Sequence, residues 1–242
     1  MIREVLNLIA AILYLLVGGY IIFKFKDRLP YKIITVVLTF LIFVPYVFSL
    51  INFYRKDSWW NFNNVLPTSN ISSLMFTMVF VVLFLPKIIK KHFYLLMTML
   101  SFTMIVAGIG SPIWYMFFDR YYPFFSIEWI THFTMAFFGI YLLLTKRIEI
   151  TVKNCLKALM IIYMIVAIMI VLNIIFGTSF FGLAFNGEHH IYRHIIIPNP
   201  YLSALVYITG VTFFLVTGYF FLKFIKKIDE KRAVVVDEEQ TT

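Results

Sequence analysis

Two ionisable side chains, Glu128 and His132, are four residues apart at the start of an apolar run. On a helix this spacing places both on one face, with the carboxylate one turn nearer the helix start. A carboxylate there can fix the imidazole tautomer and support a charged ring. Ionisable residues at membrane depth usually face a bundle interior or a wet cavity, so His132 is a candidate general base and Glu128 its orienting partner. The structural alternative is a hydrogen bond from His132 to a neighbouring helix, with Glu128 among the lipid headgroups.

Hydroxyl and amide side chains occur at the ends of three other apolar runs, on the same predicted side of the membrane as His132. Serine or threonine beside histidine can support nucleophilic chemistry, and asparagine can hold an oxyanion. The candidate nucleophiles are Thr68, Ser69 and Ser73, and the candidate substrate-binding residues are Asn70, Asn173, Asn199 and Tyr201. A pocket lined by such groups would suit a lipid ester or an acyl chain. Each residue also has a structural alternative, since Ser and Thr commonly bond their own backbone and Asn bonds across membrane helices.

A histidine-rich segment near residue 190 favours a loop over a metal site. His190 and His194 are four residues apart and could share a metal if the segment were helical. Asn186-Gly187 just upstream is typical of a tight hairpin, so we expect a polar loop facing the headgroups. Cys155 is the only cysteine, which leaves neither a disulfide framework nor a cysteine-based zinc motif. We therefore predict no metal and no cofactor.

The composition is too apolar for a soluble globular domain. Of the 242 residues, 62% are hydrophobic, 19% aromatic and only 14% charged, and the mean hydropathy is +0.89. So much apolar surface has to meet lipid. The formal charge of +9 could indicate nucleic acid, but Lys and Arg cluster at the ends of apolar runs, where they signal topology. We expect a multi-pass protein of the cell membrane whose partners are membrane lipids, with no nucleic acid.

Seven apolar runs are long enough to cross about 30 Å of hydrocarbon as helices that rise about 1.5 Å per residue. They cover residues 5–23, 32–53, 71–85, 93–117, 127–144, 156–176 and 202–224. We predict an all-α membrane protein with one seven-transmembrane-helix bundle over residues 1–228, including an outer cap loop at residues 177–200. The polar residues 229–242 have no core to join and predict a disordered cytoplasmic tail.

The basic residues predict the orientation of these runs. Counted over alternate connections, sixteen of the 21 Lys and Arg residues lie on one side of the membrane and five on the other. The amino terminus is therefore predicted outside and the carboxyl terminus in the cytoplasm. Recurrent glycines, among them Gly18, Gly108, Gly139, Gly210 and Gly218, predict close helix packing. Gly110-Ser111-Pro112 predicts a bend in the fourth run.

The order of several motifs along the chain resembles that in the YwaF-like family of integral membrane proteins, to which the transmembrane protein 164 type acyltransferases are related. The resemblance spans the whole chain and implies a seven-helix fold with an outside amino terminus. It also implies acyl transfer or another lipid-modifying activity. Its elements are Leu66-Pro67 ahead of the third run, His132 in the fifth, Asn173-x-x-Phe176-Gly177-Thr178 ending the sixth, and Pro198-x-Pro200-Tyr201 opening the seventh.

The chain departs from that family where thiol chemistry would occur. The family's third helix typically begins Leu-Pro-x-His-x-Cys, and the corresponding stretch, residues 66–71, has neither histidine nor cysteine. Cys155 lies on the opposite predicted side of the membrane and cannot substitute. The androgen-induced-gene type of intramembrane hydrolase is similar in pairing a threonine with a histidine on another helix, as Thr68 or Ser69 with His132 would.

Two hypotheses follow. The first is a lipid-active enzyme, hydrolase or acyltransferase, with an outer-leaflet site around His132. The second is a non-catalytic membrane protein that binds a lipid or a partner and has lost the family's reactive groups. A small-solute transporter is disfavoured, because we find no polar residues for a path through the inner half of the bundle.

Overall fold

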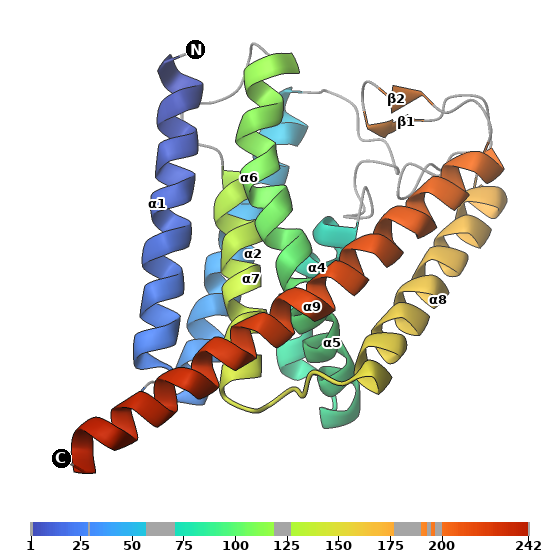
Figure 1. The fold of residues 1–242 in the computed structure, drawn as a ribbon. Helices are drawn as coiled ribbons and strands as arrows, with labels where there is room; N and C mark the ends of the chain where they lie inside the picture. Colours follow the sequence, from blue (N-terminus) through green and yellow to red (C-terminus); the bar gives the residue numbers. More distant parts are fainter. Residues whose placement is uncertain are drawn as a thin grey trace.

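The chain folds into apolar helices and one short hairpin (Figure 1). The computed structural model describes residues 2–28, 30–56, 71–118, 127–176, 190–192, 195–196 and 200–241. In chain order the elements are α1 (Ile2–Phe25), α2 (Tyr31–Lys56), α4 (Ile71–Val81), the 3₁₀ turn η1 (Val82–Phe84), α5 (Lys87–Met99), α6 (Ser101–Phe118), α7 (Ile127–Leu144), α8 (Val152–Phe176), β1 (His190–Tyr192), β2 (Ile195–Ile196) and α9 (Pro200–Thr241).

Several of these helices could cross a membrane. Within the described ranges, α1, α2, α8 and α9 are long and apolar enough to span, and the bent pair α5–α6 can count as a fifth span. The helices α4 and α7 are apolar but shorter. The helices therefore agree with the predicted multi-pass membrane protein at the level of four to five candidate spans.

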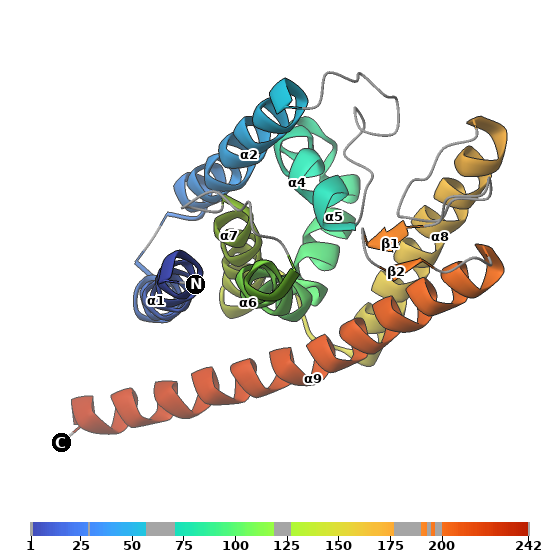
Figure 2. The same ribbon diagram turned by 90° about the horizontal axis from the view of Figure 1, so that it is seen from above.

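The helix α7 lies at the centre of the molecule. Seen from above in Figure 2, it is surrounded by α1, α2, α5 and α6, and it packs against all four. Each of its residues from Phe133 to Leu144 is buried. We call α1, α2 and α4–α7 together the bundle, and the pair α8–α9 the arm.

The chain bends sharply where α5 meets α6. Their axes differ by 50°, and Leu100 joins them. On either side of Leu100, the Thr98 hydroxyl donates to the Tyr94 carbonyl over 2.9 Å and the Ser101 hydroxyl donates to the Met97 carbonyl over 3.1 Å. Such bonds from Ser and Thr to the preceding turn bend helices, which accounts for a bend without proline.

Two glycines let other helices lie directly on this bend. A Cβ atom at Gly139 of α7 would come within 2.5 Å of the Met97 carbonyl oxygen and 2.1 Å of the Ser101 Oγ. A Cβ atom at Gly218 of α9 would come within 2.8 Å of the Met99 carbonyl oxygen. The bend is therefore held between α7 on one side and α9 on the other, and only glycine permits either approach.

The arm crosses the bundle obliquely. The helix α9 packs on α6 and on the bend, while α8 packs along α9 and against α5. In Figures 1 and 2, α9 runs diagonally across the bundle, and its start lies beside the end of α8, away from α1 and α2. The Tyr163 hydroxyl and the Thr212 Oγ1 are 2.6 Å apart and link the two helices of the arm.

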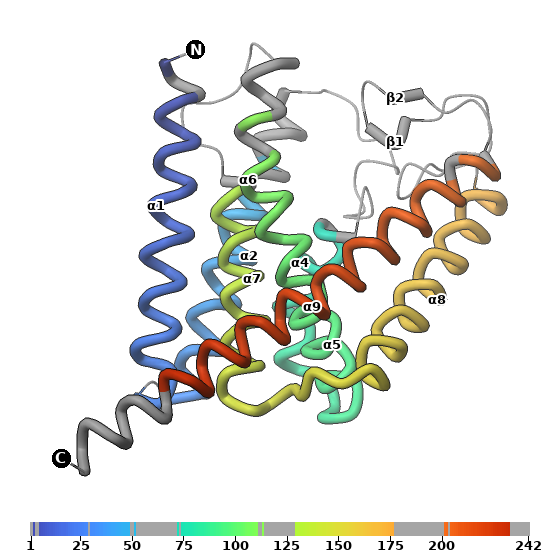
Figure 3. The backbone as a smooth tube through the Cα atoms, viewed as in Figure 1, coloured from blue at the N-terminus to red at the C-terminus, as the bar shows by residue number. Residues whose placement is uncertain are grey.

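The connections that carry basic residues share one end of the molecule. Figure 3 shows the turn from α1 to α2, the turn from η1 to α5 and the segment from α7 to α8 together at the lower end of the view. This arrangement agrees with the pairing of basic connections that the sequence predicts.

Three predictions differ from the structure. The predicted fourth run, 93–117, is two helices, and the bend lies at Leu100, whereas α6 is continuous through Gly110-Ser111-Pro112. The predicted third run, 71–85, is α4 followed by the 3₁₀ turn η1. The tail from residue 229, predicted to be disordered, continues α9 as a helix to Thr241, because this segment contains neither glycine nor proline to end it.

Candidate functional site

His132 lies inside the bundle, on the second turn of α7. Its ring is partly buried and meets the ring of Phe76 of α4 edge to face, with centroids 4.9 Å apart and planes at 88°. Phe76 in turn contacts Tyr46 of α2, with ring centroids 5.5 Å apart. The prediction that His132 faces neighbouring helices agrees with these contacts.

The structure describes little of the predicted nucleophile segment. Thr68, Ser69 and Asn70 lie outside the described residues, and so do the side chains of Ser73 and Glu128. The backbone of Ser73 belongs to the first turn of α4, and that of Glu128 to the first turn of α7. The neighbouring hydroxyl of Ser72 donates to the Met104 sulfur over 3.6 Å, so it is directed towards α6.

The sequence predicts that the starts of α4, α7 and α9 and the end of α8 meet. In the structure, the starts of α4 and α7 meet without the other two ends. Phe76 and His132 bring α4 and α7 together. The end of α8, which carries Asn173, and the start of α9, which carries Tyr201, lie beside each other across the molecule from the start of α7 (Figures 1 and 2). This corrects the predicted convergence, and the cause is the oblique crossing of α9. Asn199 lies outside the described residues.

The two described substrate-binding candidates differ in exposure. Asn173 is 1% exposed, whereas Tyr201 is 79% exposed. Near Asn173, the carboxyl-terminal half of α8 borders an open hollow of about 250 Å³ whose lining is entirely aliphatic: Ala167, Ile168, Val171 and Leu172. Such a lining can hold an alkyl chain by burial of apolar surface, and it offers no group for acid–base chemistry.

A polar contact that the sequence did not predict joins α1 to α7. The Tyr14 hydroxyl and the Thr134 Oγ1 are 2.7 Å apart. The Tyr14 ring also packs against Trp129, Phe133 and Phe137, with ring centroids 5.6, 6.4 and 5.7 Å away. Because this hydroxyl pair is enclosed by aromatic rings, it positions α1 on the helix that carries His132.

A second unpredicted cluster lies at the basic end of the molecule. The guanidinium of Arg147, just beyond α7, lies 4.4 Å above the ring of Tyr31, the first residue of α2. Tyr31 stacks on Tyr141 of α7, with centroids 6.4 Å apart and planes at 13°. The sequence reasoning counted Arg147 only as a topology signal. Tyrosines placed at the inner ends of two predicted helices were the available clue.

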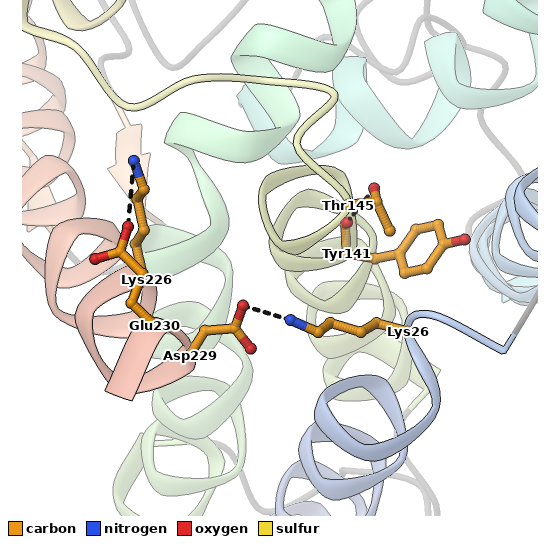
Figure 4. Close-up of polar contacts among 6 residues, drawn as sticks. All are labelled: Lys26, Tyr141, Thr145, Lys226, Asp229 and Glu230. Carbon is orange, nitrogen blue, oxygen red and sulfur yellow. Dashed lines mark hydrogen bonds and ion pairs between the residues drawn. The ribbon is translucent and has the colours of Figure 1, made fainter. Parts of the chain in front are cut away.

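The same end carries an ion pair between distant parts of the chain. Lys26, in the turn after α1, pairs with Asp229 of α9, and both side chains are largely buried, at 15% and 19% exposure. Lys226 and Glu230 form a more exposed pair, 3.7 Å apart, along α9 itself. Figure 4 shows Lys26 reaching across to Asp229 near Tyr141 and Thr145. The first pair therefore ties the arm to the bundle.

Metal-ligating side chains do not cluster in the described part of the chain. No group of three or more His, Cys, Asp or Glu residues there could hold a metal ion. Cys155 is a buried free thiol in α8. His190 belongs to strand β1, which pairs antiparallel with β2, so it is not on the helix that a shared site with His194 would need.

We compared the chain with models of known protein families, with curated proteins and with solved structures, and no match was found.

Proposed function

We propose that this chain is a seven-pass membrane protein, similar to the YwaF-like family, that binds a membrane lipid without converting it. The observation that carries the proposal is the aliphatic hollow of about 250 Å³ on the carboxyl-terminal half of α8. An acyl chain is the ligand that such a lining takes, because every lining group is a hydrocarbon.

The placement of the predicted catalytic groups favours binding over conversion. Acyl transfer needs a nucleophile, a base and an oxyanion donor around one reacting atom. The end of α8 and the start of α9 lie across the molecule from the start of α7 (Figures 1 and 2), so Asn173 and His132 are carried by separate regions. The hollow on α8 is accordingly suited to the acyl chain of a lipid and not to its ester group.

Photochemical cross-linking tests the proposal. A phospholipid with a diazirine near the end of one acyl chain would be incorporated with the purified protein in nanodiscs, and cross-linked peptides would be mapped by mass spectrometry. We expect labelling of the peptide that contains Ile168 and Val171. Val171→Trp should fill the hollow and reduce this labelling about five-fold, because a bulky ring takes the place of the chain.

Leu156→Trp is the matched control, since Leu156 is as exposed as Val171, at 55% against 52%, and lies four turns nearer the other end of α8. It should leave the labelling unchanged. Equal labelling of the wild-type protein and the Val171→Trp variant would contradict a lipid in the hollow.

A lipid-active enzyme is the second candidate, and the position of His132 favours it. An ionisable ring in contact with Phe76 inside a bundle is a functional candidate by default. In that reading His132 is the general base, and the nucleophile comes from the segment containing Ser69. His132→Ala should then change the lipid composition of producing cells, whereas Val171→Trp should not. Identical lipid profiles for the wild type and His132→Ala would exclude this candidate.

The proposed orientation places the amino terminus outside and the end that carries Arg147 in the cytoplasm. Single cysteines introduced at exposed positions would test it in a Cys155→Ser background. A membrane-impermeant thiol reagent added to intact cells should label Ile2→Cys and leave Val152→Cys unlabelled. The reverse pattern would contradict the orientation.

A further inference from the structure

The end of α7 holds two basic residues in a fixed and strained turn. Lys146 has φ of 56°, the one positive value at a non-glycine residue in the described ranges. Its N–H bonds the Leu143 carbonyl and the Arg147 N–H bonds the Leu142 carbonyl, each over 2.9 Å, which is the usual glycine-terminated helix ending. Left-handed backbone is less favourable for lysine than for glycine, because the lysine Cβ crowds the following carbonyl oxygen. The charged Lys146 therefore occupies a position at which glycine would be more stable, and backbone strain of this kind is common at functional sites.

The Arg147 guanidinium is held in place and still has free donors. It lies 4.4 Å above the Tyr31 ring, which stacks on Tyr141. The two ion pairs in the described part of the chain use Lys26 and Lys226, so no described carboxylate forms an ion pair with Arg147. The carboxylate of Asp27 is close enough to act on the same Tyr141 hydroxyl as Arg147, yet it is not paired with the guanidinium. A guanidinium stacked through its face leaves its edge N–H groups available for a planar or tetrahedral oxyanion.

The neighbouring start of α2 is also suited to an anion. The first helical bond of α2 runs from the Ile34 N–H to the Pro30 carbonyl, so the N–H groups of Tyr31, Lys32 and Ile33 precede it. These groups carry the positive end of the helix dipole. Around the start of α2 and the end of α7, exposed basic residues outnumber exposed acidic ones. The basic residues are Arg28, Lys32, Lys146 and Arg147, and the acidic ones are Asp27 and Glu149.

We propose that Arg147, with Lys146 and the first turn of α2, forms a site for the phosphate group of an anionic membrane lipid. From Met135 to Leu144 the side chains of α7 carry no charge, so the guanidinium of Arg147, three residues later, lies at the depth where lipid phosphates occur. Arginine binds phosphate through paired N–H donors, which a lysine cannot reproduce. The site is at the opposite end of α8 from the aliphatic hollow, so it does not depend on the lipid proposed there.

Lipid-dependent thermal stabilisation tests this site. The purified protein would be unfolded in detergent with increasing phosphatidylglycerol or, as a neutral reference, phosphatidylcholine. A bound lipid raises the unfolding temperature in proportion to its affinity and concentration. We expect stabilisation by phosphatidylglycerol that Arg147→Ala weakens about ten-fold in apparent affinity. Arg147→Lys keeps the charge and should lose about three-fold, because the stacked, paired geometry is gone.

Lys91→Ala is the control, because Lys91 is an exposed residue of α5 and its removal changes the net charge equally. It should change the apparent affinity less than two-fold. Equal losses for Lys91→Ala and Arg147→Ala would overturn the site in favour of general charge attraction. If Arg147→Ala does not fold, the comparison of Arg147→Lys with Lys91→Ala decides in the same way.

Free phosphate shares the chemistry of the lipid headgroup, so a further titration separates the two. Inorganic phosphate would be added in phosphatidylcholine, at the concentration at which phosphatidylglycerol is half effective. Stabilisation by phosphatidylglycerol alone supports a lipid ligand, because the acyl chains hold the headgroup at the membrane edge. Equal stabilisation by inorganic phosphate overturns the assignment to lipid.

Discussion

The helices α7 and α8 are both continuous and rich in apolar residues, yet only α7 is largely buried. The helix α7 has 18 residues, and every residue from Phe133 to Leu144 is buried. The 25 residues of α8 bury one narrow stripe and expose large side chains such as Met160 and Ile174. Hydrophobicity therefore does not decide which helix becomes the core of this membrane bundle, because lipid accepts apolar side chains as readily as protein does.

The two helices differ in how closely their backbones approach neighbouring helices. In α7, Gly139 lies against the bend between α5 and α6, and the hydroxyl of Thr134 meets Tyr14 of α1. The helix α8 has no glycine, and its hydroxyl contact, Tyr163 with Thr212, joins it only to the other helix of the arm. Small residues and paired hydroxyls thus fix the core, and their scarcity leaves the arm at the edge.

Replacing Gly139 with alanine should disrupt the packing of α7 on the bend, and we expect it to have the largest effect on stability. The added methyl would lie within 2.5 Å of the Met97 carbonyl and 2.1 Å of the Ser101 Oγ, so α7 must move from the bend. We expect the free energy of unfolding in detergent to fall by about 3 kcal/mol. Gly210→Ala is the control, because nothing lies within 4 Å of its added Cβ, and it should gain about 0.5 kcal/mol from helix propensity. Equal shifts would contradict the tight packing at Gly139.

Gly218→Ala should loosen the arm while leaving the core folded. Its Cβ would meet the Met99 carbonyl oxygen at 2.8 Å, a milder clash than at Gly139. We expect a loss of about 1 to 2 kcal/mol. Amide hydrogen exchange should become faster in α8 and α9 and stay unchanged in α7, since the arm attaches to the bundle at this crossing. Faster exchange in α7 alone would show that the two regions do not separate there.

The sequence predicts the helices better than their arrangement. The fifth apolar run coincides with α7, and the sixth and seventh lie within α8 and α9. The bend at Leu100 was missed because its cause is two side-chain hydroxyls, Thr98 and Ser101, each bonding one turn back, and such bonds are optional for these residues. Proline at 112 was the more obvious signal, and α6 continues through it.

Glycine packing was predictable by type but not by position. Added Cβ atoms at Gly18, Gly108, Gly139 and Gly218 would clash with neighbours, as the packing prediction requires, whereas nothing lies near Gly19, Gly110 or Gly210. Both groups look alike in sequence, since each glycine sits in an apolar run. The direction a glycine faces depends on the rotation of its helix, which the neighbouring helices set.

The candidate site was predictable only in part, for a related reason. The expectation that an ionisable ring at this depth faces the bundle interior agrees with the contact between His132 and Phe76, whereas the pairing of His132 with Glu128 stays a prediction. Which helix ends gather around it depends on the crossing of α9, and that depends on Gly218 and the bend. The stack of Arg147 on Tyr31 joins residues far apart in sequence, so no local pattern could reveal it.

Removing one hydroxyl from the core and one from the arm sharpens the comparison. Tyr14→Phe loses the 2.7 Å contact with Thr134 among aromatic rings, and we expect a loss of about 1 kcal/mol in the free energy of unfolding. Tyr163→Phe loses the contact with Thr212 at a ring that is 38% exposed, and should change stability by less than half as much. Chemical denaturation in detergent measures both. A larger loss for Tyr163→Phe would reverse the assignment of core and edge.

The ion pair between Lys26 and Asp229, which joins the arm to the bundle, should contribute less than the Tyr14 contact, because the hydration that both largely buried charges lose offsets much of their attraction. Asp229→Asn should lower the free energy of unfolding by about 0.5 to 1 kcal/mol, and less in high salt. Glu230→Gln is the control: its pair with Lys226 is exposed, at 63% and 54%, so its effect should be near zero. The exchanged pair, Lys26→Asp with Asp229→Lys, should recover most of the loss if the contact itself ties the arm. Failure of the exchanged pair to recover stability, with each single variant destabilised, would show that the two residues act separately and that α9 is held by its glycine crossing alone.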